Sequence, residues 1–204
     1  MKDELICYLD RLNHFKDDFV ELINFAKVQN VPIIKTEGLN ILKLIITIIK
    51  PKRILEIGTA IGYSSISMAS FADCQIDTIE RNPKMADVAR NSIEKYGYKD
   101  KIKVIEADAL LVDFSLLQKE YDLIFIDAAK GQYQKFFNLF APLLAPKGII
   151  VTDNIIFHET ILKENPPRLA KKIDEYNQFL SLHKEYKTIF LASGDGLAIT
   201  FLKD

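Results

Sequence analysis

After Pro51 the sequence alternates short, β-branched apolar runs with stretches that carry helical spacing. The run Leu123–Ile126 is apolar at every position, which is typical of a parallel strand covered by helices on both faces. Strands that alternate with helices predict an α/β fold, a doubly wound sheet with right-handed crossovers. The expected strands cover Arg53–Ile57, Gln75–Ile79, Lys103–Ile105, Leu123–Ile126, Gly148–Thr152, Thr188–Leu191 and Leu197–Phe201.

The helical stretches complete this pattern. Residues 1–50 read as helices, with one apolar stripe through Leu5, Leu9 and Leu12, and Pro51 ends the last of them. Ser193–Gly196 forms a hairpin-like turn, so we expect an antiparallel strand at the end of the sheet. No repeat or linker interrupts residues 1–204, which predicts a single domain. The later helices are expected at Tyr63–Ser70, Pro83–Tyr96, Ser115–Lys119, Gln132–Phe140 and Arg168–His183.

Composition excludes several classes of protein. The chain has 204 residues, of which 49% are hydrophobic, so it can bury a sizeable core and is not a disordered protein. Its net charge of −1 does not indicate a nucleic-acid binder. We expect no membrane helix, no secretory signal and, with only Cys7 and Cys74, no disulfide scaffold, which together predict a cytoplasmic location.

The first predicted strand runs into a glycine-containing loop. Gly58 and Gly62 would let a ligand approach the backbone, although a plain strand-to-helix turn is the alternative. Their spacing matches neither a dinucleotide fingerprint nor a P-loop. Glu56 precedes the loop, Glu80 ends the second strand, and Glu106-Ala107-Asp108 ends the third. Three acids around one nucleoside pocket would suit the positive charges of S-adenosylmethionine.

Polar residues also follow the fourth and fifth strands. Asp127 ends one strand and Asp153-Asn154 ends the next, at the same edge as the glycine loop. Two carboxylates and an amide oxygen form a site suited to Mg²⁺. Helix capping or loop hydrogen bonding is the alternative. Lys130 is either a solvated lysine or, beside a cation in a closed pocket, a base with a lowered pKa.

Taken together, four segments resemble the metal-dependent O-methyltransferases of the catechol and caffeoyl-CoA type. These segments are Leu55–Ser64, Thr78–Arg81, Phe125–Lys130 and Thr152–Asn154. Within that group, the chain is most similar to the bacterial tRNA 5-hydroxyuridine methyltransferases. This narrower similarity rests on Val31-Pro32-Ile33, Asp127–Gln134, Lys172–Asn177 and Gly194–Ile199.

The resemblance implies a Rossmann-like methyltransferase sheet of order 3-2-1-4-5-7-6, with strand 7 antiparallel and extra N-terminal helices, usually in a homodimer. It implies Mg²⁺ on Asp127, Asp153 and Asn154, with Lys130 and Asp127 as the catalytic residues. It also implies that S-adenosylmethionine is held by Ile34, Glu56, Gly58, Ser64, Glu80, Asp108, Ala109 and Asp127.

Three hypotheses follow for what the chain does. The first is Mg²⁺-dependent methylation of the C5 hydroxyl of wobble 5-hydroxyuridine in tRNA, giving 5-methoxyuridine. The second keeps the chemistry but has a small catechol-like phenol as the methyl acceptor, because the segment 157–168 is short and weakly basic. The third is a catalytically silent nucleotide-binding scaffold. His158 follows the metal motif and is a candidate substrate contact, whereas Cys74 is expected to fill the core.

Overall fold

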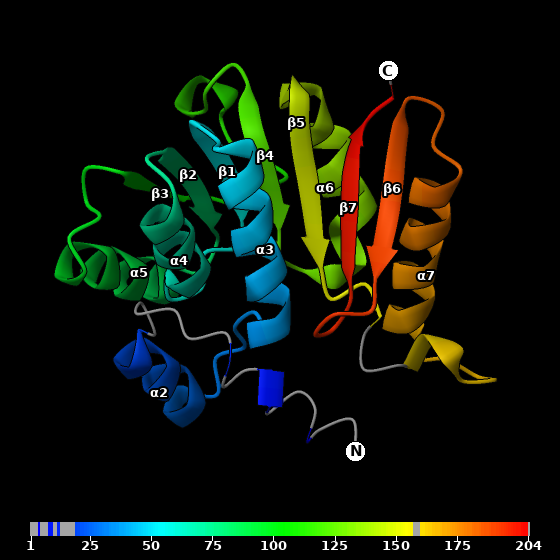
Figure 1. Cartoon of the computed structure of the whole chain (residues 1–204), viewed down its shortest axis with the longest axis horizontal. Helices are drawn as coiled ribbons and strands as arrows, with labels where there is room; N and C mark the ends of the chain where they lie inside the picture. The colour runs from blue at the N-terminus through cyan, green and yellow to red at the C-terminus, as the bar shows by residue number, and fades with distance from the viewer. Residues whose placement is uncertain (1–3, 5–7, 10–11, 13–18, 157–159, 204) are drawn as a thin grey trace.

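The computed structural model describes residues 4, 8–9, 12, 19–156 and 160–203. Their strands form one seven-stranded sheet in the order β3-β2-β1-β4-β5-β7-β6 (Figure 1). β7 is antiparallel to both β5 and β6, and the other pairs are parallel. The predicted fold class is confirmed. The strands are β1 (Arg53–Ile57), β2 (Gln75–Glu80), β3 (Ile102–Glu106), β4 (Tyr121–Ile126), β5 (Leu144–Asp153), β6 (Tyr186–Leu191) and β7 (Leu197–Leu202).

Helices cover this sheet on both faces (Figure 1). Asn82 caps α5 with its side chain, which accepts a hydrogen bond from the Lys84 amide at 3.0 Å, and Pro83 occupies the first turn. The connector from Val31 to Lys35 has no regular structure. The helices are α2 (Val20–Gln29), α3 (Thr36–Ile49), α4 (Tyr63–Phe71), α5 (Pro83–Lys95), α6 (Tyr133–Phe140) and α7 (Arg168–Ser181).

The helix predicted over Ser115–Lys119 is wrong, because this segment holds only a 3₁₀ turn at Phe114–Leu116. Asp113 caps that turn by accepting from the Ser115 amide, and Leu117 is already extended, so no α-helix can propagate. Of the stripe through Leu5, Leu9 and Leu12, Leu5 lies outside the described residues, and the side chains of Leu9 and Leu12 are exposed.

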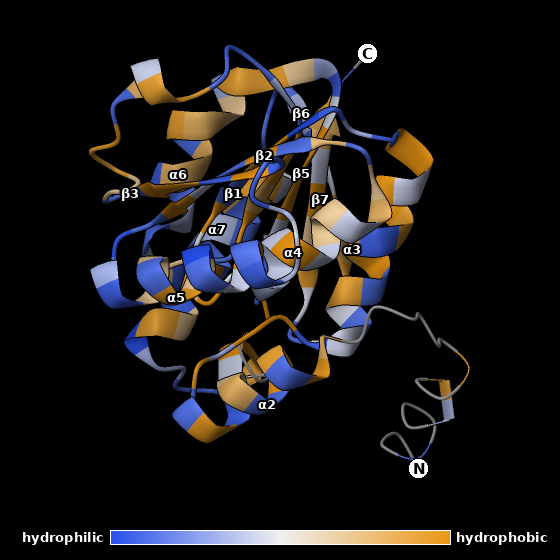
Figure 2. Ribbon diagram, turned by 90° about the vertical axis from the view of Figure 1, so that its left-hand side faces the viewer, coloured by the Kyte–Doolittle hydropathy of each residue, from blue (hydrophilic) through white to orange (hydrophobic). Residues whose placement is uncertain are grey.

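The core lies in two layers, one on each face of the sheet. One layer packs α3, α4 and α5 against side chains such as Ile54 and Phe125. The other packs α6 and α7 against Leu55, Ile124 and Ile126. In Figure 2 the central strands are mostly hydrophobic and α5 carries many hydrophilic residues. Successive side chains of β1 and β4 point to opposite faces of the sheet, and both faces are covered by helices. The residues at the ends of these strands are therefore the ones left to form a site.

Among the described residues, no helix is both long enough and apolar enough to cross a membrane.

Candidate active site

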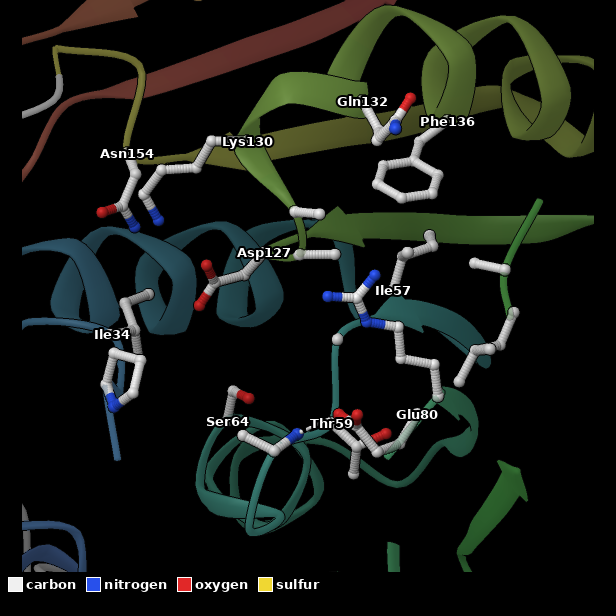
Figure 3. A pocket seen from close by; sticks show the side chains of 18 of the residues that line it. Ile34, Ile57, Thr59, Ser64, Glu80, Asp127, Lys130, Gln132, Phe136 and Asn154 are labelled. Carbon is white, nitrogen blue, oxygen red and sulfur yellow. Dashed lines mark hydrogen bonds between the residues drawn. The ribbon is translucent and has the colours of Figure 1, made fainter. Parts of the chain in front are cut away.

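A cavity of about 530 Å³ opens at the carboxyl ends of β1, β2 and β4 (Figure 3). Such a volume is typical of small-molecule sites, and this edge of a doubly wound sheet is where ligands bind. Most of the residues predicted to hold S-adenosylmethionine lie in its wall. They are Ile34, Gly58, Ser64, Glu80, Asp108, Ala109 and Asp127.

The glycine loop brings β1 and β4 together at the floor of this cavity. Gly58 has a φ of 103°, and a Cβ there would lie 2.0 Å from the Asp127 carbonyl oxygen. Only glycine allows this approach, which places the Asp127 side chain beside the loop. Gly62 has a φ of 86° and precedes α4, so that helix begins at the cavity wall.

Glu80 is held by backbone amides at the end of β2. One carboxylate oxygen accepts from the Ala60 amide at 2.9 Å, and the other accepts from the Asn82 amide at 2.8 Å. Figure 3 shows Glu80 beside Thr59 and Ser64 at one end of the cavity. An acid fixed in this way can accept hydrogen bonds from the ribose hydroxyls of a nucleoside. Glu106, in contrast, pairs with Arg90 at 3.1 Å and lies outside the cavity wall, which leaves Asp108 as the acid of this segment.

Glu56 lies behind the loop rather than in the wall of the cavity. Its side chain is fully buried and accepts hydrogen bonds from Ser65 and, at 2.5 Å, from Thr78. Thr78 in turn hydrogen-bonds Thr59 at 2.6 Å. Burial raises the pKa of Glu56 from its ordinary value of 4.5 to about 7, and the hydroxyls of Ser64 and its neighbours lower it only in part. Glu56 therefore supports the glycine loop from below.

The acidic centre of the site consists of the buried carboxylate of Asp153 and the half-buried carboxylate of Asp127, which lines the cavity. Asp153 is 3% exposed and its pKa is raised to about 7, first by burial and then by the charge of Asp127. Burial likewise raises the pKa of Asp127, and the Lys130 ammonium opposes this. Asn154 donates to Asp153 at 2.8 Å and has a left-handed φ of 63°. In Figure 3 the side chain of Lys130 points towards Asn154 and Asp127.

The chemistry of these donors fits a divalent cation. Two carboxylates whose charges disfavour each other in a buried site would both be stabilised as anions by one Mg²⁺, and Asn154 adds an amide oxygen. Within the described ranges, no three or more His, Cys, Asp or Glu side chains are grouped to hold a metal. Two carboxylates and one amide oxygen would leave positions on a bound ion open for water or substrate.

Asp195 is a cavity residue that sequence reasoning missed. It lies in the turn between β6 and β7, lines the cavity, and its charge raises the pKa of both Asp127 and Asp153. Its place in a Gly-Asp-Gly turn indicated only a hairpin, since the approach of this turn to β4 and β5 is a tertiary contact. His158 lies outside the described residues.

Comparison with known proteins gives a consistent set of relatives. A protein-family model described as O-methyltransferase matches residues 15–203. A catechol O-methyltransferase from Niastella koreensis is 34% identical over 173 residues, which is 79% of this chain and 78% of that protein. A caffeoyl-CoA O-methyltransferase from Populus kitakamiensis is 29% identical over 171 residues, or 78% and 73% of the two chains.

Solved structures agree with these relatives. A proposed caffeoyl-CoA O-methyltransferase from Staphylococcus aureus superposes with a TM-score of 0.89 at 38% identity, covering 99% of both chains. The Podospora anserina methyltransferase PaMTH1, solved with S-adenosylhomocysteine (SAH) bound, has a TM-score of 0.89 at 26% identity and covers 100% of this chain and 95% of that one. With this fold, this cavity and these relatives, the chain belongs to the O-methyltransferase family and is an S-adenosylmethionine-dependent O-methyltransferase.

Proposed function

We propose that this methyltransferase acts on a small phenol with two neighbouring oxygens, using Mg²⁺ held by Asp127, Asp153 and Asn154. The observation that carries the proposal is the pair of carboxylates at the ends of β4 and β5, half-buried at Asp127 and buried at Asp153, each with a raised pKa, beside Lys130. A catechol-like acceptor presents two oxygens on adjacent carbons, which can bind one cation together.

Two observations favour a small acceptor over the wobble uridine of tRNA. The relatives described above are named for catechol and caffeoyl-CoA. The described wall of the cavity also carries four acids, Glu80, Asp108, Asp127 and Asp195, against two bases, Arg81 and Lys130. A tRNA substrate needs a surplus of cations for its phosphates. The tRNA hypothesis is therefore the second candidate.

The residues of the site divide the reaction between them. Mg²⁺, when bound, would lower the pKa of the acceptor hydroxyl and stabilise its oxyanion. Lys130, in its neutral amine form, would accept the hydroxyl proton, because its side chain points to the acidic centre. The acceptor oxygen then bonds to the methyl carbon as the carbon–sulfur bond breaks, and the electron pair remains on sulfur, which yields SAH. The glycine loop and Glu80 orient the donor for this displacement.

Asp153→Asn tests this assignment. We expect the rate of methyl transfer to a catechol acceptor to fall by about a hundredfold or more, because the charge that holds the cation is lost. The affinity for SAH, measured by calorimetry, should change by less than about threefold. Asp174→Asn, at an exposed position of α7, is the matched control and should behave as the unmodified protein.

The same assay includes tRNA that contains 5-hydroxyuridine as a second acceptor. A wild-type rate in Asp153→Asn would contradict the role of the acidic centre. Faster methylation of the tRNA than of every vicinal diol tested would reverse the order of the two acceptor hypotheses.

A further inference from the structure

Two segments far apart in the chain meet at the rim of the cavity. One is the connector between α2 and α3, whose residues Pro32, Ile33 and Ile34 line the cavity. The other is the turn Ser193–Gly196 between β6 and β7, which contributes Asp195 to the same wall. Figure 1 shows the start of α3 next to this turn. Neither segment has regular structure, so contacts between them determine how firmly the rim is closed.

Two polar contacts join the turn to the connector and to the start of α3. The Lys35 ammonium pairs with the Asp195 carboxylate at 2.7 Å, and the Ser193 hydroxyl donates to the Glu37 carbonyl oxygen at 3.1 Å. The Asp195 side chain is 13% exposed and that of Lys35 is 49% exposed, so this ion pair is partly shielded from water. Such a pair is stronger than one on the open surface.

The start of α3 also packs closely against Ile34, Asp153 and the turn. Gly38 lies so close that a Cβ there would be 3.3 Å from the Ile34 side chain and 3.9 Å from an Asp153 carboxylate oxygen. A Cβ at Gly194 would lie 3.4 Å from the Gly38 amide nitrogen. Movement of this helix end away from the turn would therefore carry the Ile34 wall away from Asp153 and widen the cavity.

We propose that Lys35 and Asp195 form a clamp that keeps the cavity closed and limits how fast the methyl donor and SAH leave it. Both act as positioning residues, since the clamp works through the connector Pro32–Ile34. The inference rests on the S-adenosylmethionine-dependent activity. It is independent of the acceptor and of Mg²⁺, because its test uses SAH alone.

The test measures the release of tritium-labelled SAH into an excess of unlabelled SAH. Lys35→Met and Asp195→Asn should each release SAH about fivefold faster than the unmodified protein. The double variant should match the single ones, because either change already breaks the clamp. The exchanged pair Lys35→Asp with Asp195→Lys should recover much of the slow release.

Lys101→Met is the matched control, because it removes an ion pair with Asp73 of 3.0 Å at the start of β3, at the opposite edge of the sheet. It should leave the rate of release unchanged. Two results would overturn the clamp. One is normal release from Lys35→Met with only a lower melting temperature, which is what a purely structural role predicts. The other is a double variant in which the effects of the single changes multiply.

Discussion

At the scale of single residues, Gly58 determines whether the donor loop and the acidic centre can lie side by side. Its φ is 103°, and a Cβ at this position would lie 2.0 Å from the Asp127 carbonyl oxygen, so there is no room for a side chain. Gly58→Ala should lower the free energy of unfolding by about 3 kcal/mol and abolish SAH binding, because strain and overlap add.

Gly97→Ala is the comparison for this change. Gly97 has a φ of 80°, but an added Cβ would meet no described atom within 4 Å. We expect it to cost only the backbone strain, about 1 kcal/mol, with normal SAH binding. Urea unfolding and calorimetry measure both quantities. Equal losses in the two variants would show that close approach to Asp127 is not what requires glycine at position 58.

Glu56 gives the protein a stability that depends on pH. Its carboxyl has a pKa of about 7 in the folded state against an ordinary value of 4.5, so the folded protein holds a proton that the unfolded chain releases between these values. Stability therefore falls as pH rises through this window, by up to about 3 kcal/mol from this group. Glu56→Gln stays neutral and should lack this part of the dependence.

The measurement is urea unfolding of both proteins from pH 5 to pH 8. The free energy of unfolding of the unmodified protein, relative to that of Glu56→Gln, should decrease steadily across the range. Glu120→Gln, at a side chain that is 58% exposed, is the control and should follow the unmodified protein. Parallel curves for Glu56→Gln and the unmodified protein would contradict the raised pKa.

Sequence reasoning found the residues at strand ends and missed those set by tertiary contacts. Asp127 and Asp153 follow apolar strands, so their place at one edge of the sheet could be predicted from order alone. Glu56 was expected at the cofactor but lies beneath the loop, because its side chain turns towards Ser65 and Thr78. Asp195 was placed only in a turn and not in the site, since it reaches the cavity only when the last hairpin packs beside α3.

At the scale of elements, Tyr121 ties β4 to β2 across β1. Its hydroxyl donates to Asp77 at 2.6 Å and accepts from the Gln118 amide at 2.9 Å, while its ring is fully buried. Tyr121→Phe leaves the Asp77 carboxylate and an amide without their partner. We expect the free energy of unfolding to fall by about 2 kcal/mol.

Tyr121 is the first residue of β4, and neither it nor Asp77 lines the cavity. The SAH affinity of Tyr121→Phe, measured by calorimetry at a temperature where the variant is folded, should equal that of the unmodified protein. A weaker affinity for SAH with an unchanged free energy of unfolding would show that this hydrogen bond supports the binding site rather than the sheet.

Element boundaries show where local sequence is insufficient. β5 begins at Leu144, before the expected Gly148, because pairing of Leu144 with Tyr121 extends it across Pro146. A proline at that position argues against a strand in the sequence alone. The register shift between Tyr121 and Leu123 accommodates this irregular start.

At the scale of the whole molecule, the alternating pattern predicted a doubly wound sheet, while the order 3-2-1-4-5-7-6 came from family resemblance. The spacing of apolar residues cannot distinguish one strand order from another, because a buried strand has the same apolar pattern whichever strands it pairs with. The Ser193–Gly196 turn did identify the antiparallel end correctly. The homodimer that the resemblance implies stays a prediction, as does the single-domain organisation of residues 1–204.

The central claim is that the acidic centre holds Mg²⁺ for an acceptor with two neighbouring oxygens. It is tested most directly by the rate of methyl transfer from labelled S-adenosylmethionine to a catechol and to the matching monophenol, each with Mg²⁺ and with chelator. We predict rapid transfer only for the catechol with Mg²⁺. Equal rates for catechol and monophenol, or a catechol rate that the chelator leaves unchanged, would contradict the claim.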